Sequence, residues 1–169
     1  MIVVYKKPEL EETYVLKKRL FTKDDSYREK MQMIREARIL YSITHKSIIK
    51  FHDAFRTERD ELCIVTEYCK KGNLAQLIKQ HKEEGTQIDI RDIFKYVAQI
   101  CTGLEHMHNY KVLHRDLMPS NIFLADDDTV KIGDVGSAKV FQHTISMAKT
   151  GDLGTKVYMA PEMFSANES

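Results

Sequence analysis

The feature that most constrains the fold of this chain is a long amphipathic helix, predicted from about Ile90 to His108. Apolar residues recur there at spacings of three, four, three, four and three, which places them on one side of an α-helix. The residues of this stripe are Ile90, Ile93, Val97, Ile100, Leu104 and Met107. Asp89 and Asp92 suit the helix N-terminus electrostatically. We therefore expect a helix with one strongly buried face.

The part of the chain before Gly72 contains two predicted strand pairs. Ile2–Lys6 and Thr13–Arg19 are rich in Val, Tyr and Leu and predict a β-hairpin. Ile48–Phe55 and Leu62–Tyr68 predict a second pair around the charged turn at residues 57–60.

A helix is predicted between these two strand pairs. Ser26 and Glu29 fit a capping box, in which each side chain satisfies one free N–H at the helix start. An apolar stripe follows, made of Met33, Ala37 and Leu40. Glu36 lies beside this stripe, so its carboxylate can face inward.

The second half of the chain is mainly helical. A short helix is predicted over Leu74–His81, before the long one. Two short strand-like segments, Ile122–Leu124 and Val130–Ile132, flank three adjacent aspartates at residues 126–128, which we interpret as a solvated turn and not a metal site. Strands followed mainly by helices predict an α+β fold with a β-rich lobe and a helical lobe.

Composition excludes several classes of function. The 169 residues suit a single domain, and a net charge of +1 gives no electrostatic signature of a nucleic-acid or membrane partner. Cys63, Cys69 and Cys101 lack a C-x-x-C spacing, which argues against a disulfide framework or a zinc site. No stretch has the length of a secretory or membrane-spanning segment, so we expect a cytoplasmic protein, with a nuclear location also open.

The strongest motif is the octet at residues 114–121, His-Arg-Asp-Leu-Met-Pro-Ser-Asn. It resembles the catalytic loop of protein kinases, H-R-D-L-x-x-x-N. Such a loop presents a carboxylate, here Asp116, to orient the proton of a substrate hydroxyl, and an amide, here Asn121, to hold Mg²⁺. The alternative is an ordinary polar loop after a helix, which the octet disfavours.

Weaker motifs lie before and after the octet in a consistent order. Asp134 stands in a D-V-G tripeptide, and residues 154–162 resemble the segment ending in A-P-E that closes a kinase activation loop. Upstream, Lys17 ends a strand motif similar to V-A-I-K, and Glu36 can pair with it. Each alone has an ordinary reading as a turn, a loop or a solvated side chain; their order and spacing carry the interpretation.

Together these motifs resemble a eukaryotic protein kinase domain of the Ser/Thr type, from Ile2 to Glu162. Details similar to the NIMA-related (NEK) kinases are the segments at residues 14–17, 67–69, 72–74, 97–101 and 121–124. The resemblance implies a two-lobed fold: an N-lobe over residues 1–66, a hinge over 67–71 and a mainly helical C-lobe over 72–169. It also implies ATP and Mg²⁺ as cofactors and proteins as substrates.

The resemblance also assigns roles to individual residues. Asp116, Lys17 and Asn121 would be catalytic, and Asn121 and Asp134 would bind the metal. ATP would contact residues on both lobes: Lys17, Glu36, Glu67, Cys69, Asn121 and Asp134. Among these, backbone groups of Glu67 and Cys69 would bind adenine, with Thr66 as gatekeeper. His114 would be a packed residue and not a base.

Four departures from the family pattern bear on activity. No glycine precedes Gly72, so the Gly-rich loop over the phosphates is missing. Met118 replaces a Lys that contacts the γ-phosphate, and Val135 replaces a Phe that packs between the lobes, beside Leu40 and His114. The chain ends shortly after Glu162, so we expect a domain truncated at both ends, with part of the apolar stripe of the long helix uncovered.

Three hypotheses follow from these observations. The chain is a Ser/Thr kinase, weak or inactive in this truncated form; a pseudokinase that binds ATP or protein partners as a scaffold; or a non-functional fragment of a longer kinase. Within the expected activation loop, the candidates for regulatory phosphorylation are Thr144, Ser146, Thr150 and Thr155.

Overall fold

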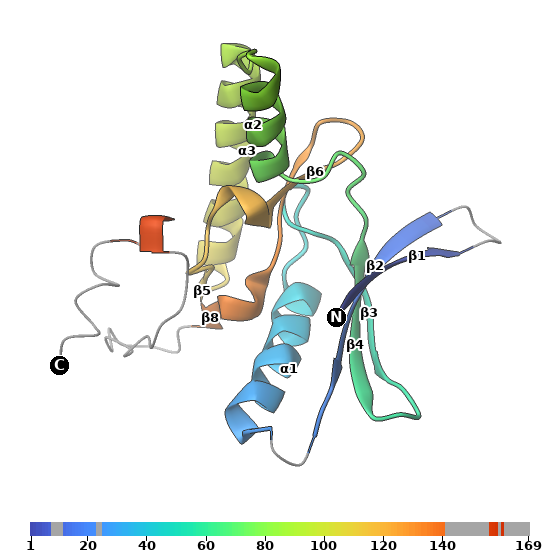
Figure 1. Cartoon of the computed structure of the whole chain (residues 1–169). Helices are drawn as coiled ribbons and strands as arrows, with labels where there is room; N and C mark the ends of the chain where they lie inside the picture. Colours follow the sequence, from blue (N-terminus) through green and yellow to red (C-terminus); the bar gives the residue numbers. More distant parts are fainter. Residues whose placement is uncertain (8–11, 23–24, 141–155, 159, 161–169) are drawn as a thin grey trace.

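The computed structural model describes residues 1–7, 12–22, 25–140, 156–158 and 160. Its sheet strands are β1 (Ile2–Lys7), β2 (Glu12–Leu20), β3 (Phe51–Arg56) and β4 (Glu61–Glu67), and its helices are α1 (Tyr27–Ser42), α2 (Leu74–Glu84) and α3 (Ile90–Asn109). Short elements complete it: β5 (Val112–Leu113), η1 (Pro119–Asn121), β6 (Ile122–Leu124), β7 (Val130–Ile132), η2 (Val135–Ser137), β8 (Lys139–Val140) and η3 (Lys156–Tyr158). Figure 1 shows the β1–β4 sheet on one side of the molecule and α2 and α3 on the other. The predicted α+β, two-lobed arrangement is confirmed.

The sheet is antiparallel, with strand order β1-β2-β4-β3. The predicted hairpin is present, because β1 pairs with β2 in a register that places Ile2 opposite Lys17. β2 also pairs with β4, so Lys17 lies opposite Ile64, which is buried. Strand pairing on both sides therefore fixes the backbone position of Lys17.

The prediction of a strand beginning at Ile48 was wrong, because β3 begins at Phe51. Ile48 and Ile49 instead join the segment before β3 to β7: the Ile49 N–H donates to the Ile132 carbonyl at 2.8 Å, and the Ile132 N–H donates to the Ser47 carbonyl at 2.8 Å. These two apolar residues therefore serve the connection between the lobes.

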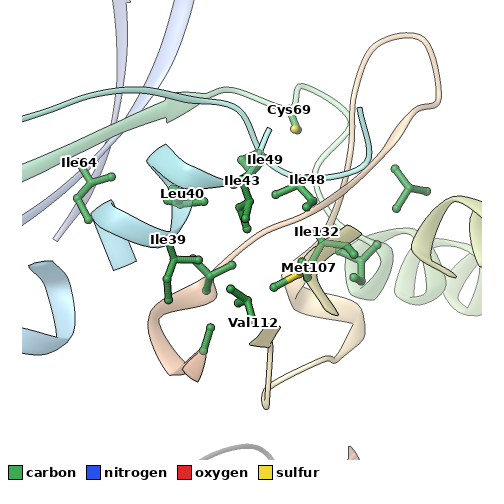
Figure 2. Packing of buried hydrophobic residues seen from close by; sticks show 14 of the residues in the cluster. Ile39, Leu40, Ile43, Ile48, Ile49, Ile64, Cys69, Met107, Val112 and Ile132 are labelled. Atoms are coloured by element: carbon green, nitrogen blue, oxygen red, sulfur yellow. The ribbon is translucent and has the colours of Figure 1, made fainter. Parts of the chain in front are cut away.

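One hydrophobic core runs from α1 into the C-lobe. Figure 2 shows Ile39 and Leu40 of α1, and Ile43 directly after it, gathered near Ile48 and Ile132, with Met107 beyond them. The inward position predicted for Glu36 is confirmed, since it is buried on the same helix as Met33 and Leu40. Glu29, of the predicted capping box, has a side chain outside the described part of the structure.

The first C-lobe helix, α2, extends to Glu84, beyond the predicted end at His81. Asn73 caps its N-terminus in a capping box with Gln76. Gly85 ends the helix with φ 66°, a left-handed conformation that glycine adopts without steric cost. Among the described helices, none is long and apolar enough to cross a membrane.

The long helix α3 matches its predicted bounds within one residue, but its burial differs. Gly103 and Met107 are buried, whereas Ile90 and Val97 are 60% and 50% exposed. Only the C-terminal half packs closely on the lobe connection, where a Cβ on Gly103 would lie 2.8 Å from Ile132 Cδ1 and 3.1 Å from the Ser47 carbonyl oxygen. The expectation of one strongly buried face was therefore wrong at the N-terminal end, and the expected uncovered part of the stripe is present.

Candidate functional site

The site centres on the ammonium group of Lys17. Its Nζ lies 2.8 Å and 2.9 Å from the two carboxylate oxygens of Glu36 and 3.2 Å from Asp134 Oδ1. Three separate segments supply these side chains: β2, α1 and the residues directly after β7. The fold therefore brings together residues as far apart in sequence as Lys17 and Asp134.

The electrostatics of this cluster follow from its burial. Burial alone would lower the pKa of Lys17, but the carboxylates of Glu36 and Asp134 outweigh it and raise that pKa above its usual value. Burial raises the pKa of Glu36, and the adjacent ammonium offsets only part of that rise. Asp134 differs, because its side chain is 48% exposed. One carboxylate thus anchors Lys17 from inside, and the other faces solvent.

Asp134 is held in a specific backbone conformation. Its φ of 51° and ψ of 59° lie in the left-handed region, where aspartate is among the better tolerated residues. The preceding Gly133 donates its N–H to the Asn121 carbonyl at 2.9 Å. A side chain at Gly133 would meet Phe123 Cε2 at 2.6 Å, so only glycine allows this close approach.

His114 contacts the same turn through its imidazole ring. Its Nε2 lies 2.8 Å from the Gly133 carbonyl, and its Nδ1 accepts the Asp116 N–H at 3.3 Å. These contacts fit a neutral ring that carries its proton on Nε2. The side chain is buried, and burial lowers its pKa, an effect that the Gly133 carbonyl opposes. The prediction of a packed histidine is confirmed.

Asp116 and Asn121 lie together on the loop before β6. Asn121 Nδ2 donates to the Asp116 carbonyl at 2.8 Å and to Asp116 Oδ2 at 3.1 Å. Both contacts use the nitrogen of the amide, which orients its Oδ1 away from Asp116. Arg115 has φ 64°, so the chain turns sharply just before the carboxylate. The octet thus forms a loop that brings Asp116 and Asn121 together, as the sequence predicted.

The expected hinge follows β4. Glu67 ends that strand, with its N–H donating to the Lys50 carbonyl at 3.0 Å. The Cys69 carbonyl accepts the Gly72 N–H at 3.2 Å. Burial raises the pKa of the Cys69 thiol to about 12, so this cysteine is a packing residue and not a nucleophile.

The oxygen donors of this site fit magnesium, a hard cation. Asp134 supplies an exposed carboxylate and Asn121 an oriented amide oxygen, and phosphate oxygens complete such a coordination shell in phosphoryl-transfer enzymes. Within the described ranges, no group of three or more His, Cys, Asp and Glu gathers in a way that could hold a metal ion by itself.

Sequence reasoning missed two residues around the site, Gln32 and Lys131. Gln32 donates from Nε2 to the Gly136 carbonyl at 3.2 Å, and Lys131 Nζ lies 3.1 Å from Glu67 Oε1. The four-residue spacing of Gln32 and Glu36 on one helix is a signal that could have revealed the first. No sequence signal pairs Lys131 with Glu67. The predicted phosphorylation candidates of residues 144–155, and Glu162, lie outside the described residues.

Comparison with known proteins agrees with this geometry. The model of the protein kinase domain family matches residues 3–169. The chain is 38% identical over 138 residues to serine/threonine-protein kinase Nek1 of Mus musculus, covering 82% of this chain and 11% of that protein. It is 36% identical over 139 residues to probable serine/threonine-protein kinase nek2 of Dictyostelium discoideum, covering 80% and 33%. It is 35% identical over 144 residues to serine/threonine-protein kinase Nek2 of Homo sapiens, covering 81% and 32%.

The chain therefore spans between 11% and 33% of the length of these curated relatives. The family match nevertheless covers nearly all of the chain and includes every residue of the Lys17 cluster and of the Asp116 loop. On the combined ground of fold, site geometry and sequence similarity, this chain belongs to the protein kinase family.

Proposed function

We propose that this chain transfers the γ-phosphoryl group of ATP, with magnesium, to serine or threonine hydroxyl groups of protein substrates. The observation that carries the proposal is the position of Lys17, whose Nζ lies 2.8 Å from Glu36 Oε1 and 3.2 Å from Asp134 Oδ1. A rigid cation between a buried and an exposed carboxylate is suited to phosphates that approach from the exposed side.

Each residue of the site has a role in this proposal. Lys17 would bind the α- and β-phosphates, with Glu36 holding its side chain in place. Asp134 and Asn121 would hold magnesium, which supplies neutralisation of the phosphate charge when bound. Asp116 would orient the substrate hydroxyl and take its proton. The backbone of Glu67 and Cys69 would bind adenine.

The substrate class rests on the relatives, all of which carry serine/threonine kinase in their names. At 35–38% identity, the same preference for aliphatic hydroxyls is the simplest proposal for this chain.

A second candidate function is nucleotide binding without efficient transfer, in a protein that acts as a scaffold. Met118 favours this alternative, because its thioether cannot neutralise charge that develops on a transferred phosphoryl group. Val135 favours it too, since a smaller side chain provides less packing between the lobes than the Phe that the family pattern contains there.

A phosphate-transfer assay distinguishes the two functions. Purified protein is incubated with labelled ATP, magnesium and a generic protein substrate, and the Asp116→Asn variant is compared with Asp92→Asn, the same change on an exposed helix position. We expect Asp116→Asn to lower the rate about 10²–10⁴-fold, the usual contribution of a general base, and Asp92→Asn to leave it unchanged. Thermal stabilisation by Mg-ATP with no transfer above the Asp116→Asn background would favour the scaffold instead.

A further inference from the structure

The contact between α1 and η2 suggests a role for a residue outside the family motifs. Gln32 lies one helical turn before Glu36, so both side chains project from one face of α1. The orange segment beside α1 in Figure 1 includes η2, which begins directly after Asp134. Gln32 Nε2 donates to the Gly136 carbonyl at 3.2 Å.

Gly136 lies very close to the charged cluster. A Cβ on this residue would come within 3.1 Å of Glu36 Oε2 and 3.2 Å of Asp134 Oδ1. The backbone of η2 is therefore held against the same carboxylates that contact Lys17. Asp134 is only two residues earlier, so we expect a displacement of Gly136 to be transmitted to it.

The two ends of this short segment are fixed by different parts of the fold. Gly133, on one side of Asp134, is hydrogen-bonded through its N–H to Asn121 and through its carbonyl to His114. Gly136, on the other side, accepts a hydrogen bond at its carbonyl from the side chain of Gln32 on α1. Asp134 lies between these points in a left-handed conformation, which aspartate tolerates better than most residues and which the two anchors help to keep.

We propose that Gln32 is a positioning residue: its side-chain amide holds the Gly136 backbone against α1 and keeps Asp134 in the conformation that binds magnesium. The exposure of Gln32 supports this role over one in the core. Its neutrality also matters, because a carboxylate at the same place would oppose the Gly136 carbonyl and lie near Glu36 and Asp134. The magnesium part of this inference rests on the proposed function.

The test compares Gln32→Met with Gln80→Met. Methionine keeps the length of the side chain and removes the donor. Gln80 is an exposed glutamine on α2 whose Nε2 lies 2.8 Å from Glu84 Oε1, so it is a matched control away from the site. Gln32→Glu is a third variant, in which a side chain of almost the same shape carries an acceptor in place of the donor.

The first measurement needs no nucleotide. Hydrogen exchange of the backbone amides at residues 135–138 reports on η2, where the Ala138 N–H donates to the Val135 carbonyl at 2.9 Å. We expect faster exchange there in Gln32→Met, faster still in Gln32→Glu, and the wild-type rate in Gln80→Met. Equal exchange in Gln32→Met and wild type overturns the proposal, whether or not the protein binds ATP.

The second measurement is nucleotide affinity with magnesium and with EDTA, by displacement of a fluorescent ATP analogue. We expect Gln32→Met to weaken the magnesium-dependent affinity about three- to tenfold, the size of one neutral hydrogen bond, and to leave the EDTA value unchanged. An equal loss in both conditions, or no loss in either, shows that Gln32 does not position Asp134. A wild type that binds no nucleotide in either condition refutes the proposed function, and the exchange rates then decide on Gln32 alone.

Discussion

His114 is a titratable residue in a place where charge is costly. It is 3% exposed and makes hydrogen bonds through both ring nitrogens, to the Gly133 carbonyl and the Asp116 N–H. Burial lowers its pKa below the usual value, and the Gly133 carbonyl counteracts this only in part. The folded protein therefore keeps His114 neutral at a pH where the unfolded chain binds a proton.

This difference predicts a pH dependence of stability. As the pH falls below about 6.5, the unfolded state takes up a proton at His114 first, so the free energy of unfolding decreases until the pH reaches the lower folded pKa. We expect His114→Gln, which cannot titrate, to show a shallower decrease between pH 7 and pH 5 in urea titrations. Part of the slope should remain, because burial also lowers the pKa of His45 and His52. Parallel curves for the two proteins would contradict this assignment.

Substitution of the single residue Met118 tests how much a positive charge contributes to phosphate transfer. If the proposed function holds, Met118→Lys places a cation on the loop of Asp116, two residues after it, and we expect a higher rate constant for phosphate transfer. One preorganised electrostatic group is commonly worth on the order of 10²–10³ in rate. Met118→Gln adds polarity without charge and serves as the control. An equal effect of both variants would show that charge is not the missing element.

At the scale of elements, the packing of α3 depends on Gly103. Alanine in place of glycine ordinarily stabilises a helix interior by about 1 kcal/mol. Here the added Cβ would lie 2.8 Å from Ile132 Cδ1 and 3.1 Å from the Ser47 carbonyl oxygen, so α3, Ile132 or Ser47 would have to shift within a buried contact. Overpacking of this kind costs about 1–3 kcal/mol.

We therefore expect Gly103→Ala to destabilise the protein by about 1–2 kcal/mol, opposite in sign to its helix propensity. Thr102→Ala changes the neighbouring, exposed position on α3 and should cause no loss. Chemical denaturation of both variants measures the difference. A Gly103→Ala variant as stable as the wild type would mean that Ile132 and Ser47 yield easily.

The bounds of the helices and strands show which elements could be predicted from local sequence patterns. Sequence patterns located the ends of α3 within one residue and gave the bounds of β6 and β7 without error, because these signals are local to each segment. The same patterns predicted too early a start for β3, and they predicted a buried face along the whole of α3, whose N-terminal half is largely exposed. Ile48 and Ile49 look like strand residues by composition, but both are buried in the core beside β7, where Ile48 forms a bridge with Ile132, a residue far along the chain.

At the scale of the whole molecule, an ion pair ties the hinge to the C-lobe. Lys131 Nζ lies 3.1 Å from Glu67 Oε1, with the side chains only 15% and 21% exposed. The same Glu67 oxygen accepts the Lys50 N–H at 2.6 Å. One carboxylate thus connects the end of β4, the segment before β3 and the strand that leads to Asp134.

Lys131→Met should therefore destabilise the protein, because it leaves Glu67 poorly compensated in a half-buried position. We expect a loss of about 1–3 kcal/mol in urea denaturation. Lys70→Met breaks the exposed pair with Asp126, at 65% and 59% exposure, and should change stability little because solvent screens that pair. If the two variants lose the same amount, the burial of the Lys131 pair has no energetic consequence.

The sequence by itself determined the family, the α+β class and the identity of the residues in the candidate site. Lys17, Glu36, Asp116, Asn121 and Asp134 are recognisable because phosphate chemistry demands particular side chains in a particular order, and order is a property of the chain. Their roles in ATP and magnesium binding stay predictions until the assays above are done.

Only the tertiary structure decided which groups support that site. It placed Gln32 on Gly136, Lys131 on Glu67 and Gly103 against Ser47. These contacts join distant segments through a hydrogen bond, an ion pair and a close approach without a side chain. Such partners are chosen by the folded geometry, because residues of the same type carry the same local signal and still pair differently: Lys131 contacts Glu67, whereas Lys70 contacts Asp126.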